Sequence, residues 1–172
     1  MKKIIQYILK ILSKKILDKY KPEIIGITGS VGKTSTKDAI KKILEKNYNI
    51  RANIKNYNNE IGVPLTIIGK ESPAKSIWGW FNIISEGIRL ILTRDKNYPK
   101  ILILEMGADR IGDIEYLNSF ISCNIAVITN ISESHLEFFN TVQKIEKEKR
   151  KIIENLKQEN FAILNFDLGL TR

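Results

Sequence analysis

The stretch "EIIGITGSVGKTSTKD", residues 23–38, decides how the rest of the chain is interpreted. It begins with "EIIGIT", a short apolar run bounded by a glycine-rich segment, which predicts a buried strand. The residues from Lys33 to about Lys46 are typical of a helix. A strand, a glycine-rich loop and a helix that opens on Lys-Thr form an arrangement that binds phosphate groups, because backbone amides and the helix dipole point at the anion.

The glycines of this loop differ in spacing from the common P-loop. That pattern requires a glycine at the position that Ile27 occupies here. Glycines stand instead at 26, 29 and 32. The residues that follow keep the expected chemistry, since Lys33 can pair with β- and γ-phosphates and Thr34 can ligate Mg²⁺. The sequence therefore predicts a phosphate site despite the unusual spacing.

Short apolar runs and helical patterns alternate along the rest of the chain. Uninterrupted Ile, Leu and Val strands separated by helices predict an α/β fold, with a P-loop-type, mostly parallel sheet and helices on both faces. We expect strands at 23–28, near 50, and at 100–105, 124–129 and 161–165. We expect helices at 33–46, from 63, and at 76–92, 112–121 and 141–156.

Composition narrows the class of protein. A chain of 172 residues with 43% hydrophobic and 27% charged residues fits one globular domain. Its single cysteine, Cys123, excludes an internal disulfide framework and fits a reducing cytoplasm. The net charge of +9 favours anionic partners. No RNA- or DNA-binding motif accompanies that charge, so we do not expect a nucleic-acid partner.

Two helical segments raise the question of a membrane surface. In residues 1–20, isoleucines and leucines form one stripe with lysines opposite. This helix either packs on the domain or rests as a basic amphipathic helix on an anionic membrane surface, which would place the protein at the inner face of the membrane. The segment "SIWGWFNIISEGIRLIL", 76–92, is apolar but short and interrupted by charges. We interpret it as a helix that could lie at the periphery of a membrane, and not as a membrane span.

Two further candidates lie at strand ends. In α/β sheets, ligands bind at the carboxyl ends of the strands. Glu105 ends the strand 100–105, where NTPases keep a metal ligand or a water-positioning acid. The alternative is a solvated residue that only ends the strand. His135, the only histidine, follows the strand 124–129 at the same edge, and it is either functional or structural.

Helical geometry singles out Lys149. At about 100° per residue, the apolar residues of the helix 141–156 share one face. Lys149 falls near the centre of that face, so it either extends out to solvent or points into a polar pocket. We favour the pocket, because the catalytic edge of the sheet is near. The apolar residues are Val142, Ile145, Ile152, Ile153 and Leu156.

Four ordered motifs resemble one known family. The loop "GITGSVGKTSTKD" is similar to the ATP loop of the Mur ligases and of the related folylpolyglutamate and cyanophycin synthetases. Three further segments are similar to the D-alanyl-D-alanine-adding branch of that family, MurF. The resemblance extends from about Glu23 to Asp167. The three segments are "NYNNEIGVPLT" (56–66), "LEMGADRIGDIEYL" (104–117) and "ITNISESHLEFF" (128–139).

The resemblance implies an ATP-dependent ligase of peptidoglycan precursor synthesis in the cytoplasm. ATP would phosphorylate the carboxylate of a UDP-muramoyl peptide, and D-alanyl-D-alanine would attack the acyl phosphate to form an amide. Lys33, Glu105, His135 and Lys149 would be catalytic. Thr34, Glu105, His135 and a carbamylated Lys149 would ligate Mg²⁺. The ATP-binding residues would be Gly29, Ser30, Val31, Gly32, Lys33, Thr34, Ser35, Asn59, Glu60 and Asn130.

The resemblance also sets expectations for the domains. Residues 1–21 would be a basic helix and 22–172 a truncated central ATP-binding domain, without the UDP-binding and C-terminal domains. We expect a chain that binds Mg-ATP without completing ligation alone, or one part of a split enzyme whose partner chain supplies those domains. Two alternatives stay open. One is another P-loop NTPase or kinase, which does not explain "NYNNEIGVPLT". The other is a non-catalytic, membrane-associated binding module.

Overall fold

A five-stranded parallel sheet forms the centre of the computed structural model, which describes residues 2–54, 56–133 and 136–165. The strand order is β2-β3-β1-β4-β5, and every neighbouring pair is parallel. The α/β fold predicted from the sequence is therefore confirmed. The strands are β1 (Glu23–Thr28), β2 (Ile50–Ala52), β3 (Ile101–Glu105), β4 (Ile125–Ile128) and β5 (Phe161–Leu164).

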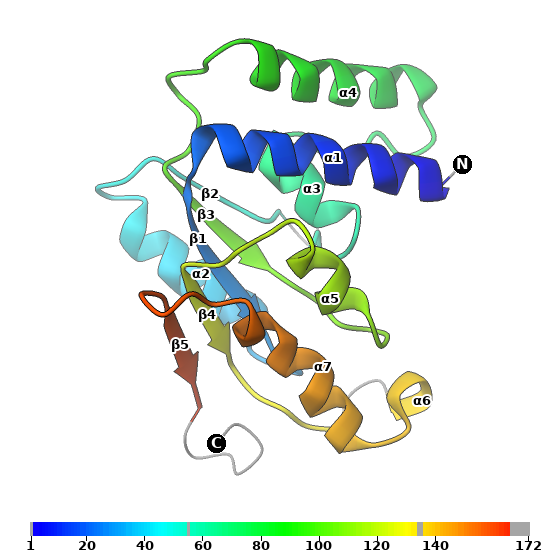
Figure 1. The fold of residues 1–172 in the computed structure, drawn as a ribbon, viewed down its shortest axis with the longest axis vertical. Helices are drawn as coiled ribbons and strands as arrows, with labels where there is room; N and C mark the ends of the chain where they lie inside the picture. Colours follow the sequence, from blue (N-terminus) through cyan, green and yellow to red (C-terminus); the bar gives the residue numbers. More distant parts are fainter. Residues whose placement is uncertain (1, 55, 134–135, 166–172) are drawn as a thin grey trace.

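Helices cover both faces of this sheet (Figure 1). Successive strand residues point to opposite faces of the sheet, so the strands contribute side chains to two separate apolar clusters. The helix α2 (Lys33–Leu44) packs on the face that carries Ile25, Ile27 and Ile103. The other face belongs to the larger cluster, to which the remaining helices contribute. Those that approach the sheet or each other there are α3 (Gly62–Ile68), α5 (Asp113–Asn118) and α7 (Val142–Glu154).

Two long helices form an outer layer beyond α3. The helix α1 (Lys2–Tyr20) packs on α3 and α4, and α4 (Ile77–Leu92) packs on α1 and α3. In Figure 1, α4 is the helix farthest from the sheet. Leu9, Leu12 and Ile16 of α1 are buried, so the prediction that the first helix packs on the domain is confirmed. None of the described helices is long and apolar enough to cross a membrane.

The helix boundaries agree with expectation to within a few residues. The helix expected to run to about Lys46 ends at Leu44 in a turn, and α5 is shorter than the expected 112–121. Such differences are ordinary, because the ends of helices fray. The short helix α6 (Leu136–Phe139) lies where the sequence indicated only a loop.

Candidate functional site

The glycine-rich loop joins the end of β1 to the start of α2 at the carboxyl edge of the sheet. Gly32 has a φ of 84° and Gly29 a φ of 150°, in a region that side chains disfavour. A Cβ on Gly29 would lie 2.0 Å from Thr129 Oγ1. The amide of Ser30 donates to the Asn130 carbonyl at 2.7 Å, and Thr129 Oγ1 donates to the Val31 carbonyl at 2.6 Å. The residues that follow β4 therefore hold the loop in place.

The N-terminus of α2 is arranged to receive an anion. The first amides of a helix have no partner within the helix, and no side chain caps those of α2. Their orientation and the helix dipole favour a negative group at this position. The Lys33 ammonium folds over the loop and donates to the carbonyls of Gly29, at 2.7 Å, and Ser30, at 3.2 Å. A positive charge and free amides thus face the same space.

Glu105 ends β3 beside this loop. Its side chain is buried, so it is not a solvated residue that merely ends a strand. Thr34 Oγ1 donates to one carboxylate oxygen and Asn58 Nδ2 donates to the other, each at 3.0 Å. Asn53 accepts from the Glu105 amide at 2.5 Å and donates to its carbonyl at 3.3 Å. The carboxylate is therefore fixed in direction next to the Thr34 hydroxyl.

Lys149 points into the same site from α7. Its side chain is only 2% exposed, so the prediction of an inward lysine is confirmed and the solvent-directed alternative is wrong. Its ammonium donates to the Gly29 carbonyl at 3.2 Å, the carbonyl that Lys33 also uses. Burial, and then the nearby charge of Lys33, lower the pKa of Lys149 to about 8. A substantial fraction of this amine is therefore neutral slightly above neutral pH.

The segment before α3 carries Asn59 and Glu60, which have other partners. Asn59 Oδ1 accepts from the amides of Ile61 and Gly62 at 3.1 and 2.9 Å, and so stabilises the start of α3. Glu60 accepts from Gln6 Nε2 at 2.8 Å and forms an ion pair with Lys2 at 3.0 Å, both on α1. The described contacts of these two side chains do not include the loop 29–35, and their role toward a nucleotide stays a prediction.

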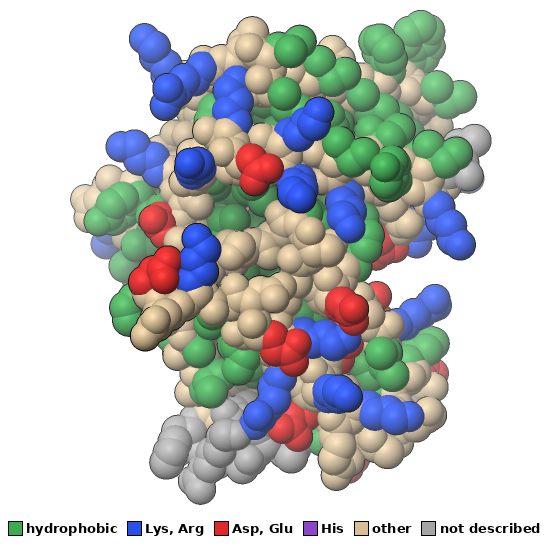
Figure 2. Space-filling model, in the orientation of Figure 1, with side chains coloured by type: hydrophobic (Ala, Val, Ile, Leu, Met, Phe, Trp, Pro, Cys, Tyr) green, Lys and Arg blue, Asp and Glu red, His purple; other side chains and the backbone are tan. Residues whose placement is uncertain are grey.

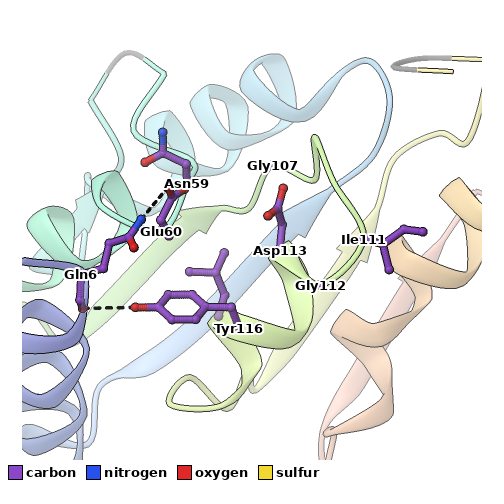
Figure 3. A pocket seen from close by; sticks show the side chains of 9 residues that line it. Gln6, Asn59, Glu60, Gly107, Ile111, Gly112, Asp113 and Tyr116 are labelled. Atoms are coloured by element: carbon purple, nitrogen blue, oxygen red, sulfur yellow. Dashed lines mark hydrogen bonds between the residues drawn. The ribbon is translucent and has the colours of Figure 1, made fainter. Parts of the chain in front are cut away.

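A cavity of about 280 Å³ lies between α1, this segment and α5 (Figure 3). Glu60 and Gln6 line one side, while Asp113 and Tyr116 of α5 line another. Tyr116 donates to the Gln6 carbonyl at 3.1 Å. Burial raises the pKa of Asp113, although the amides of Arg110 and Asp109 counteract it. The first helix thus contributes directly to the lining of this cavity. Gly107, which follows Glu105 by two residues, also lines it.

The other residues predicted to bind nucleotide or metal lie only in part at this site. Ser35 and Val31 are exposed, and Asn130 contributes its carbonyl to the loop while its buried Oδ1 has no hydrogen-bond partner in the described part of the chain. His135 lies outside the described residues. Within residues 2–54, 56–133 and 136–165, no three His, Cys, Asp or Glu side chains come together. Thr34 and Glu105 are the predicted Mg²⁺ ligands that lie in contact.

Sequence reasoning missed three residues that shape the site. Asn53 and Asn58 fix Glu105, and Thr129 fixes the loop. Asn58 lies in the quoted segment "NYNNEIGVPLT", but nothing in that run of polar residues indicated which amide would reach the carboxylate. Thr129 is the last residue of the predicted strand 124–129, at the ligand-binding edge, a signal that could have found it.

Comparison with known proteins assigns the chain to a family. Residues 27–75 and 85–170 match the Mur ligase middle domain. The UDP-N-acetylmuramoyl-tripeptide–D-alanyl-D-alanine ligase of Rickettsia prowazekii (strain Madrid E) is 34% identical over 145 residues, covering 84% of this chain and 27% of the relative. The enzyme of that name from Bacillus subtilis (strain 168) is 32% identical over 155 residues, covering 90% and 28%. The chain thus spans little more than a quarter of these relatives.

Solved structures agree with that assignment. The crystal structure of MurF ligase from Thermotoga maritima in complex with ADP aligns with a TM-score of 0.69 and 31% identity, covering 90% of this chain and 30% of that one. A ligase structure from Acinetobacter baumannii, at 23% identity and a TM-score of 0.72, shares the fold. The phosphate loop, the buried Glu105 and the inward Lys149 lie within the matched residues. The chain belongs to the Mur ligase family, as its middle domain.

Proposed function

We propose that this chain binds Mg-ATP at the loop 29–35 and supplies the ATP-binding part of a peptide ligase of cell-wall precursor synthesis. One observation carries the proposal: two lysines, Lys33 and Lys149, converge on the Gly29 carbonyl beside an uncapped helix N-terminus. The Lys33 ammonium, which donates to two backbone carbonyls, has spare capacity for anionic oxygens, and Lys149 holds the second position beside it. A triphosphate supplies such oxygens.

Each group has a distinct part in this proposal. The amides of the loop and of the first turn of α2 bind phosphate oxygens, and Lys33 exchanges its carbonyl partners for the β- and γ-phosphates. The Thr34 hydroxyl and the Glu105 carboxylate, 3.0 Å apart, are oxygen donors of the kind that Mg²⁺ prefers. When bound, Mg²⁺ neutralises charge on the phosphates during transfer. Asn53 and Asn58 keep Glu105 aimed at this position.

Lys149 fits the carbamylated lysine that the resemblance implies. A carbamate forms when a neutral amine attacks carbon dioxide and releases a proton, so the amine must lose its charge first. A pKa of about 8 makes the neutral form accessible near physiological pH. The buried position beside Gly29 would place the resulting carboxylate-like group at the phosphate loop. This supports the role of Lys149 in the proposed metal site.

The substrates of the reaction are proposed by analogy with the named relatives. The curated relatives are UDP-N-acetylmuramoyl-tripeptide–D-alanyl-D-alanine ligases. We propose the same substrates for the reaction in which this domain takes part. Because the chain spans 27% and 28% of those two relatives, the regions that recognise the UDP-sugar and the dipeptide would come from other segments or from a partner chain.

Titration calorimetry with Mg-ATP tests the nucleotide site. We expect Lys33→Ala to weaken binding by about tenfold or more, the loss typical of a charge-assisted phosphate contact. Lys41→Ala is the matched control, because Lys41 is an exposed lysine on the same helix, and it should bind as the wild type does. Equal affinities of Lys33→Ala and the wild type would remove the loop from the proposal.

A further inference from the structure

The side of α4 that faces away from the protein is apolar. The side chains of Ile77, Trp78, Phe81 and Leu92 are 65% to 83% exposed, and Ile88 is 44% exposed. At about 100° per residue these positions fall on one side of the helix. The opposite side carries Ile83, Gly87 and Leu90, which are buried. The helix is therefore apolar both where it packs on the domain and where it faces solvent.

The first helix extends this surface. Ile4, Tyr7 and Ile11 of α1 are exposed, and α1 and α4 pack side by side, with Leu12 against Gly87. Figure 2 shows hydrophobic side chains gathered over the upper right of the molecule, where Figure 1 places α4 and the beginning of α1. We call this set the outer apolar face: Ile4, Tyr7, Ile11, Ile77, Trp78, Phe81, Ile88 and Leu92.

Basic side chains border the outer apolar face. The helix α1 contains six lysines and one acidic residue, Asp18. Lys14 and Lys15 are exposed and flank the stripe of Ile4 and Ile11. Exposed Lys75 precedes α4, and exposed Arg94 and Lys96 follow it.

Two acids in or just after the second half of α4 are already paired. Glu86 and Asp95 both accept from Arg89, at 2.7 and 3.0 Å. Among the described residues, no ion pair is recorded for Lys14 or Lys15. The border of the outer apolar face therefore carries an excess of positive charge that its own acids do not neutralise.

We propose that the outer apolar face docks on an anionic lipid surface. An apolar helix side with Trp and Phe, bordered by lysines, matches the composition of helices that lie in the membrane interface. A border that is basic along both helices favours a partner that is negative over its whole surface, as an anionic lipid layer is. Negative headgroups attract the lysine border, while the aromatic and aliphatic side chains enter the boundary between headgroups and acyl chains.

The position of this face in the fold is compatible with nucleotide binding. The phosphate loop lies between β1 and α2, and α2 covers the opposite face of the sheet from the cluster to which α1 and α4 belong. In Figure 1, α4 lies on the side of α1 that is turned away from the sheet. Docking through α4 therefore leaves the carboxyl edge of the sheet open to ligands.

Vesicle binding tests the apolar part of the proposal. The purified chain should co-sediment with phosphatidylglycerol vesicles and bind phosphatidylcholine vesicles much more weakly, and tryptophan emission should shift to the blue on binding. Trp78→Ser/Phe81→Ser should weaken binding by about tenfold or more, since two large apolar side chains no longer leave water. Ile43→Ser, at a similarly exposed isoleucine of α2, is the control and should bind as the wild type does.

A second pair of variants tests the charge. Lys14→Gln/Lys15→Gln should weaken binding to anionic vesicles by about tenfold or more, and added salt should reduce wild-type binding. Lys41→Gln/Lys42→Gln removes an adjacent exposed pair from α2 instead and should have a clearly smaller effect. The proposal is overturned if anionic vesicles are not bound, or if both lysine pairs matter equally. It is also overturned if the face instead forms a dimer that Trp78→Ser/Phe81→Ser dissociates.

Discussion

The phosphate loop and the outer apolar face depart from an ordinary globular protein in opposite ways. At the loop, charged groups are inside: Glu105 and Lys149 are 3% and 2% exposed. At the outer face, apolar groups are outside: Trp78 and Leu92 are 83% and 77% exposed. Buried charges cost free energy unless they are paired, and large exposed apolar patches are rare on soluble monomers. Both departures agree with the nucleotide and the lipid surface that we propose as partners.

The two regions also differ in how firmly they are built. The Glu105 carboxylate accepts hydrogen bonds from Thr34 and Asn58, and the Glu105 amide donates to the Asn53 side chain. The exposed side chains of α4 instead have solvent on their outer side. Substitutions at the loop should therefore affect folding and ligand binding together, whereas substitutions at the outer face should affect docking alone. The following predictions test that contrast, from the largest effect to the smallest.

Among substitutions at the loop and at the outer apolar face, Gly29→Val should have the largest effect on stability. Its Cβ would overlap Thr129 Oγ1, and its φ of 150° disfavours a side chain. We expect the free energy of unfolding to fall by about 3 kcal/mol, measured by urea denaturation. Gly112→Ala is the control, because Gly112 also has a positive φ, 99°, but a Cβ there meets nothing within 4 Å. It should lose only about 1 kcal/mol; equal losses would contradict a close-packed loop.

Lys149→Met should change how stability depends on pH. The pKa of Lys149 is about 8 in the folded protein, lowered from 10.5 by burial and then by Lys33. Between these values the unfolded chain binds more protons, so stability rises with pH there, and the penalty is fully present below about pH 8. We expect this rise, about 2 kcal/mol by pH 10, to disappear in Lys149→Met.

Urea denaturation at pH 7 and pH 9.5 measures this difference. Lys147→Met is the control, since Lys147 is an exposed lysine on the same helix, and it should keep the pH dependence of the wild type. Identical pH dependence in Lys149→Met and the wild type would mean that the buried ammonium is not destabilised by its surroundings.

The smallest effect is expected at the outer apolar face. Trp78→Ser/Phe81→Ser should change the free energy of unfolding by no more than about 0.5 kcal/mol, because both side chains are largely exposed in the folded protein. Leu90→Ala, on the buried side of the same helix, should cost about 2–4 kcal/mol. Thermal and urea denaturation of the three proteins would measure both values. A large loss in the double variant would mean that the face is part of the folded core.

Sequence patterns were most informative where the regular geometry of a helix or strand sets the direction of the side chains. The apolar runs placed the strands within one or two residues, and helical phase turned Lys149 inward, because both follow from fixed residue periods. The position of Glu105 at a strand end predicted that it lies at the ligand edge. The polar segment before α3 has no such period. The family resemblance selected Asn59 and Glu60 there, and their role toward a nucleotide stays a prediction. In the structure, Asn58 contacts Glu105 and Glu60 contacts α1.

By itself, the sequence determined the parallel α/β fold, the place of the glycine-rich loop between a strand and a helix, and the inward lysine, since these depend on local pattern and chain order. Only the tertiary structure decided which side of each outer helix is buried. The single apolar stripe predicted for the first helix was wrong in part, because Ile4 and Ile11 are exposed while Leu9, Leu12 and Ile16 are buried. The helix α4 is also apolar over more than one side, and helical phase alone cannot choose between apolar sides. Which side is buried depends on which side packs closely against a neighbouring element, as Gly87 packs against Leu12. Packing against α1 and α3 left the other side of α4 facing water.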